Sequence, residues 1–110
     1  MISLTEKEKK AIDELLIGLK KLYGENLSRV ILYGSKARGE TTNGSDIDIA
    51  IIGKRFEDSS MEIKRTINIV ANVSLKYDLL IAVVPLSEKE FEKCDIPFII
   101  NVKREGIKLL

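Results

Sequence analysis

The sequence of 110 residues contains no histidine, no tryptophan and no glutamine, and it has a single cysteine, Cys94. Without histidine, the Ser-His and Cys-His pairs of nucleophilic catalysis are excluded, as are zinc sites that need imidazole. One cysteine cannot form an intramolecular disulfide, which fits a reducing compartment. Any catalysis must therefore use carboxylates, lysines, arginines, hydroxyls or a hard metal ion.

Long apolar runs and an excess of charge of one sign are also absent. No apolar segment approaches the roughly 20 residues that a membrane-spanning helix needs, and the start of the chain is charged too early for a signal peptide. The formal net charge is +1 and aromatic residues make up 5% of the chain, which argues against nucleic acid as a partner. We expect a cytoplasmic protein with no membrane partner.

The length and composition predict one globular domain over residues 1–110. Hydrophobic residues make up 45% and charged residues 32%, a mixture that can bury one modest core. Helical and strand patterns alternate along the chain. They predict a helix over about 6–23, a strand over 29–33, a helical turn over 36–38, a strand over 46–52, a helix over about 60–76, a strand over 78–84, and two further helices after Ser87 and Pro97.

This order of elements predicts an α/β (α+β) fold, a small mixed β-sheet with helices packed on it. Two sequences of the type Ser/Thr-x-x-Glu, starting at Thr5 and Ser87, indicate capping boxes that begin helices. The segment Thr41–Ser45 is rich in turn residues and predicts an exposed loop. We find no internal repeat or linker.

Two aspartates open the predicted strand over 46–52. Alternation places Ile47, Ile49 and Ile51 on one face of that strand, and Asp46 and Asp48 together on the other. Neighbouring carboxylates repel unless a cation lies between them, and Mg²⁺ prefers such oxygen ligands. Paired Mg²⁺ ions serve phosphoryl transfer and need a further carboxylate, which Asp78 supplies at the start of the next predicted strand.

A glycine-serine turn follows the predicted strand over 29–33. Gly34 would let the backbone approach a phosphate, Ser35 adds a hydroxyl, and Lys36 and Arg38 add positive charge nearby. Gly34 and Gly39 also match the glycine spacing of a Walker A loop. We reject that interpretation, because Glu40-Thr41 stands where a lysine and a hydroxyl residue are required.

These features resemble a known family. Gly34-Ser35, ten further residues and Asp46-Ile47-Asp48 are similar to the signature of the DNA polymerase β-like nucleotidyltransferase superfamily. The wider string Tyr33 to Gly39, with Ser45 before the aspartates, resembles its minimal nucleotidyltransferase (MNT) branch. Asp78 falls where that family has its third carboxylate. Lys36 departs from the pattern, since the family often has arginine there, and a lysine can make only a point-charge contact with phosphate.

The resemblance implies an activity and a partner. Members of this family transfer a nucleotidyl group, commonly AMP from ATP, to a hydroxyl with the help of Mg²⁺. Asp46, Asp48 and Asp78 would be the catalytic and metal-binding residues, and Gly34, Ser35, Lys36 and Arg38 would bind the nucleotide. Many MNT proteins are antitoxins that bind, and in some cases adenylylate, a HEPN ribonuclease toxin. The sequence leaves open whether the chain forms a homo-oligomer.

Other interpretations of the same residues stay open. The aspartates could be a solvated strand face, Gly34-Ser35 a simple turn, and Lys36 and Arg38 a solvated helical turn. The chain could also be an antitoxin that acts only by binding, or a nucleotidyltransferase that modifies nucleic acid. A chain of this length has little surface for a second substrate, so we expect an apolar patch for a protein acceptor. The candidates for that patch are Phe91, Ile96, Phe98 and the tail Ile107–Leu110.

Overall fold

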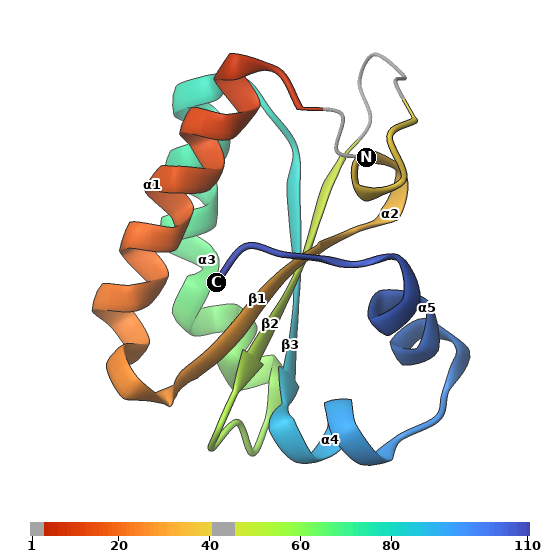
Figure 1. The fold of residues 1–110 in the computed structure, drawn as a ribbon. Coiled ribbons are helices and arrows are strands. Elements are labelled where there is room, and N and C mark those ends of the chain that lie inside the picture. The colour runs from red at the N-terminus through yellow and green to blue at the C-terminus, as the bar shows by residue number, and fades with distance from the viewer. Residues whose placement is uncertain (1–3, 41–45) are drawn as a thin grey trace.

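The computed structural model describes residues 4–40 and 46–110 and contains a four-stranded mixed sheet with helices on both faces (Figure 1). The strand order is β3-β2-β1-β4, with β1 antiparallel to β2 and β4, and β2 parallel to β3. The elements are α1 (Glu6–Tyr23), a 3-10 turn η1 (Gly24–Asn26), β1 (Leu27–Tyr33), α2 (Gly34–Ala37), β2 (Ile47–Gly53), α3 (Ser59–Tyr77), β3 (Ile81–Ser87), α4 (Glu88–Lys93), α5 (Pro97–Glu105) and β4 (Ile107–Lys108).

Both predicted capping boxes are present. At the start of α1 the Thr5 hydroxyl accepts the Glu8 N–H at 3.1 Å, while the Glu8 carboxylate accepts the Thr5 N–H at 2.9 Å. Ser87 and Glu90 make the same reciprocal pair at the start of α4. Each pair satisfies two backbone donors that a helix cannot satisfy internally, which is why these local sequences fix where the helices begin.

The sheet separates two apolar layers. Helices α1 and α3 cover one face, whereas α4 and α5 lie on the other (Figure 1). The predicted alternation along β2 is confirmed: Ile47, Ile49 and Ile51 belong to the layer under α1 and α3, and Ala50 belongs to the opposite layer. Because side chains alternate along a strand, Asp48 shares the face that α4 and α5 cover.

Several boundaries differ from the sequence-based expectation by one or two residues, and those of β3 differ by three. Strand β3 begins at Ile81, three residues later than predicted, because Asp78 adopts the left-handed conformation (φ 53°, ψ 53°) and ends α3 with its N–H bonded to the Ser74 carbonyl. The tail after Gly106 forms β4, which pairs with β1, so it belongs to the sheet.

The structure bears on two further expectations, and a third falls outside the described residues. Most of the expected apolar docking patch is packed: Phe91 is buried, and the Phe98 ring lies edge-on against Tyr33. Ile96 is 53% exposed. In the part of the chain that the structure describes, no helix is long and apolar enough to cross a bilayer. The predicted loop Thr41–Ser45 lies outside the described residues.

Candidate active site

The turn after β1 brings the backbone directly against a carboxylate of β2. Tyr33 ends β1 and pairs with Asp48 in the sheet register, and Gly34 follows with φ +76°. A Cβ atom at Gly34 would collide with the Asp48 carboxylate. Gly34 is therefore required both for its positive φ and for this close approach, and the two halves of the sequence motif meet in space.

Asp46, one residue before β2, and Asp48, the second residue of β2, form an electrostatically strained pair. Asp48 is half-buried and Asp46 is exposed. Burial raises the pKa of Asp48 and the negative charge of Asp46 raises it further, whereas the positive charge of Arg38 lowers it. Burial and the charge of Asp48 also raise the pKa of Tyr33. Like charges held together in this way favour binding of a cation.

Asp78 does not join this pair. It is an exposed residue at the end of α3. Within residues 4–40 and 46–110, no three histidine, cysteine, aspartate or glutamate side chains lie close enough together to hold a metal ion. The parallel register instead places Ala82 of β3 beside Asp48. The later start of β3 thus leaves an apolar residue next to Asp48, and the expected cluster of three carboxylates is not assembled here.

Lys36 has a different position from the one expected for a phosphate contact. Its ammonium group lies 2.8 Å from the Glu8 carboxylate, and the two side chains are only 9% and 6% exposed. The other oxygen of Glu8 accepts the Thr5 N–H in the capping box. Lys36 therefore joins α2 to the start of α1 and is not available to a phosphate in this structure. The capping sequence identified Glu8, but nothing local indicated its second partner.

Arg38 is exposed and lies close enough to Asp48 to lower the pKa of that carboxyl. Its guanidinium donates to Glu40 at 2.9 Å and to Glu105, at the end of α5, at 3.1 Å. These two carboxylates fix the orientation of the planar group. Sequence reasoning missed Glu105 as part of the site, because this contact joins segments 67 residues apart.

The donors present fit a hard divalent cation. Both Asp46 and Asp48 offer carboxylate oxygens, their repulsion is relieved by positive charge, and the Gly34 backbone limits the space on one side. Mg²⁺ binds proteins through one or two carboxylates and completes its coordination with water and phosphate oxygens. Two aspartates are therefore sufficient for one Mg²⁺ ion that a triphosphate also binds.

Asp46→Asn is expected to stabilise the metal-free protein near pH 7. The folded-state pKa of Asp48 is raised, so this group favours folding most below its unfolded pKa and loses that contribution as the pH rises through its folded pKa. Removing the Asp46 charge lowers the folded-state pKa of Asp48 and so reduces this loss of stability. We expect the melting temperature to rise by roughly 2 °C. Thermal unfolding between pH 4 and 7 measures this.

The exposed Asp13 of α1 provides the control, since Asp13→Asn removes one negative charge away from this pair. An equal stabilisation in both variants would show that net charge is responsible. Mg²⁺ with nucleotide should raise the melting temperature of the wild type by binding linkage and should have little effect on Asp46→Asn.

Comparisons with known proteins identify the family. The family described as nucleotidyltransferase domain matches residues 12–109. A protein of Methanocaldococcus jannaschii named as a protein adenylyltransferase is 37% identical over 100 residues, which cover 90% of this chain and 94% of that protein.

Two solved structures share the fold. A toxin–antitoxin with AMP-PNP has a TM-score of 0.62 at 20% identity, over 87% of this chain and 70% of that one. The complex of a tri-AMPylated Shewanella oneidensis HEPN toxin with its MNT antitoxin has a TM-score of 0.58 at 17% identity, over 94% and 71%. Because the family match covers residues 12–109 and the site brings Gly34 against Asp48, this chain belongs to the nucleotidyltransferase family and is an enzyme of that family.

Proposed function

We propose that this protein is an Mg²⁺-dependent adenylyltransferase that transfers AMP from ATP to a hydroxyl group of a partner protein. The observation that carries the proposal is the contact between the Gly34 backbone and the Asp48 carboxylate, which puts a phosphate-binding turn beside a cation-binding pair. Asp46 and Asp48 would hold Mg²⁺, and Gly34, Ser35 and Arg38 would bind the triphosphate. Lys36 supports the turn from within the fold.

Each of these residues has a physical task in the transfer. The glycine at position 34 lets backbone N–H groups approach phosphate oxygens without a side chain in between, and Arg38, oriented by Glu40 and Glu105, adds positive charge. Mg²⁺ would neutralise the charge that builds up on the phosphate oxygens. The acceptor oxygen forms a bond to the α-phosphorus as the bond to pyrophosphate breaks, so positioning and charge stabilisation account for catalysis.

The proposed partner is a HEPN toxin, with this chain as its antitoxin. Support comes from the M. jannaschii relative, named as a protein adenylyltransferase, and from the Shewanella structure, whose description gives a HEPN toxin carrying AMP groups beside an MNT antitoxin. The AMP-PNP in a second neighbour supports ATP as the donor.

One observation favours a second candidate, an antitoxin that neutralises its toxin by binding alone. Ala82 occupies the position beside Asp48 on β3, where a third carboxylate would complete a two-metal site. The two candidates are distinguished by incubating the protein with labelled ATP, Mg²⁺ and the purified product of the neighbouring gene. Transfer of label to that product supports neutralisation by adenylylation, and complex formation without label supports neutralisation by binding alone.

Gly34→Ala should weaken binding of ATP with Mg²⁺ by at least about tenfold. The added methyl group would collide with the Asp48 carboxylate and displace it from the turn, and a positive φ disfavours alanine by roughly 1 kcal/mol. Isothermal calorimetry measures the affinity. Gly24→Ala is a matched control, because Gly24 also has a positive φ (+55°) but nothing lies within 4 Å of the added atom. Equal loss of affinity in both variants would contradict the role of Gly34.

A further inference from the structure

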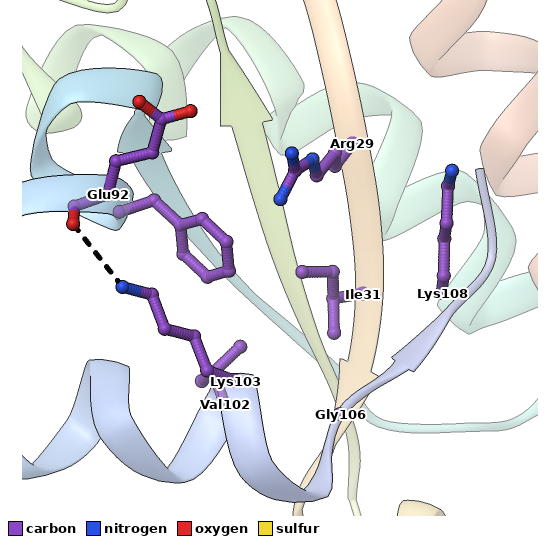
Figure 2. Close-up of a pocket in the computed structure, with 8 residues that line it drawn as sticks. Arg29, Ile31, Glu92, Val102, Lys103, Gly106 and Lys108 are labelled. Atoms are coloured by element: carbon purple, nitrogen blue, oxygen red, sulfur yellow. Dashed lines mark hydrogen bonds between the residues drawn. The ribbon is translucent and has the colours of Figure 1, made fainter.

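A hollow lies on the face of the sheet that α4 and α5 cover, away from the aspartate pair. It has a volume of about 420 Å³ and is lined by residues of β1, β4, α4 and α5. Its lining residues are Arg29, Ile31, Phe91, Glu92, Val102, Lys103, Gly106 and Lys108 (Figure 2). We call it the cationic cleft, because three of its lining side chains are positively charged and one is negatively charged.

The three cations of the cationic cleft come from separate elements that the fold brings together. Arg29 lies on β1, and the antiparallel register places Lys108 of β4 beside Ile31, two residues further along the same face. Lys103 of α5 approaches from the opposite wall and donates to the Glu92 carbonyl at 3.5 Å (Figure 2). Within residues 4–40 and 46–110, none of the three forms an ion pair.

Phe91 holds two of these cations in place. The Arg29 guanidinium lies 5.7 Å and the Lys103 ammonium 5.3 Å from the centre of its ring, distances at which a cation is attracted to an aromatic face. The ring is only 5% exposed. Their charged groups are thus directed at the cleft, while the walls of Ile31 and Val102 are apolar. This combination fits an anion on a short aliphatic stem.

We propose that the cationic cleft binds an acidic segment of the protein partner, with a glutamate or aspartate side chain entering it. This inference extends the proposed function by assigning a docking point for the acceptor. Tyr33, beside Asp48, is four residues from Arg29 along β1, roughly 13 Å. One protein covering about 800 Å² of this face can therefore occupy the cleft and present a hydroxyl to the aspartate pair.

The buried aromatic ring favours a protein carboxylate over nucleic acid. Proteins that bind single strands combine an extended basic groove with exposed aromatic rings on which bases stack, whereas Phe91 is buried beneath two cations. In the part of the chain that the structure describes, the lining of the cationic cleft holds no other aromatic residue, so a base would have no ring on which to stack.

Fluorescence anisotropy with a fluorescein-labelled hexaglutamate peptide tests the proposal. The wild type should bind this peptide more weakly as salt increases and should not bind hexaglutamine. Lys103→Gln/Lys108→Gln should weaken binding at least tenfold. The matched variant Lys20→Gln/Lys64→Gln removes two exposed charges from α1 and α3, on the other face of the sheet, and should bind as the wild type does.

Three results would overturn the proposal: no binding of hexaglutamate, equal loss in the two double variants, or tighter binding of a hexauridylate strand at the same site. Thermal unfolding of each variant shows whether it is folded. Asp48→Asn separates this inference from the proposed function, because it should lose ATP binding with Mg²⁺ and keep peptide binding. Peptide binding by a wild type that binds no ATP would refute the proposed function alone.

Discussion

Asp48→Asn should reduce AMP transfer to the partner by about a thousandfold or more. Asp48 is the carboxylate that lies against Gly34 in the turn proposed to bind phosphate, and a bound divalent ion contributes several kcal/mol to stabilising the charge of a phosphoryl transition state. Roughly 4 kcal/mol corresponds to a thousandfold change in rate. The amide keeps the size of the side chain and removes its charge, so the fold should be preserved. Single-turnover transfer of label from ATP measures the effect.

Asp78→Asn is the informative comparison. Asp78 lies at the end of α3 and outside the aspartate pair, and asparagine tolerates the left-handed conformation that this position requires. The rate of AMP transfer by Asp78→Asn should stay within a few-fold of the wild-type rate. A thousandfold loss in Asp78→Asn would show that Asp78 moves into the site when the substrates bind and would restore the cluster of three carboxylates.

Lys36→Met should lower the melting temperature by more than about 10 °C. Burying the Glu8 carboxylate without its partner costs about 3–5 kcal/mol, and about 1 kcal/mol shifts the melting temperature of a domain of this size by several degrees. The pair is almost completely buried. Thermal unfolding at pH 7 measures the change. Because the pair supports the turn after β1, affinity for ATP with Mg²⁺ should fall as well.

The exposed ion pair between Lys76 and Glu14, 2.6 Å long, provides the control. Lys76→Met should cost less than about 1 kcal/mol, as is typical of exposed pairs. The double variant Glu8→Gln/Lys36→Met should recover part of the lost stability, because no unpaired charge is then buried and glutamine can still cap α1. Equal losses in Lys36→Met and Lys76→Met would contradict the role of the buried pair.

The pH dependence of the same pair has a definite sign. Burial raises the pKa of Glu8, but hydrogen bonds from Lys36 and Thr5 and the charge of Lys36 outweigh it, so that the folded-state pKa is lowered. The contribution of Glu8 to stability is therefore present above its unfolded pKa, about 4.5, and is lost as the pH falls through the folded pKa. In Lys36→Met this acid-side loss should disappear.

Much of the architecture could be predicted because its causes are local. Capping boxes, apolar periodicity and the residues Gly34, Asp46 and Asp48 depend on neighbours within a few positions. A strand presents alternate side chains on one face in any fold, and Asp46, one residue before β2, still lies close enough to Asp48 to raise its pKa. The sequence by itself therefore determined the helices, three of the strands, the faces of β2 and the aspartate pair.

The tertiary structure alone decided what those residues meet. Lys36 forms an ion pair with Glu8 of another helix, Arg38 donates a hydrogen bond to Glu105 at the end of α5, and β4 pairs with β1. Asp78 lies outside the aspartate pair, in a left-handed conformation at the end of α3, and the parallel register places Ala82 beside Asp48. Such contacts depend on the relative placement of whole elements, which is set by packing across the sheet and leaves no local periodicity in the sequence.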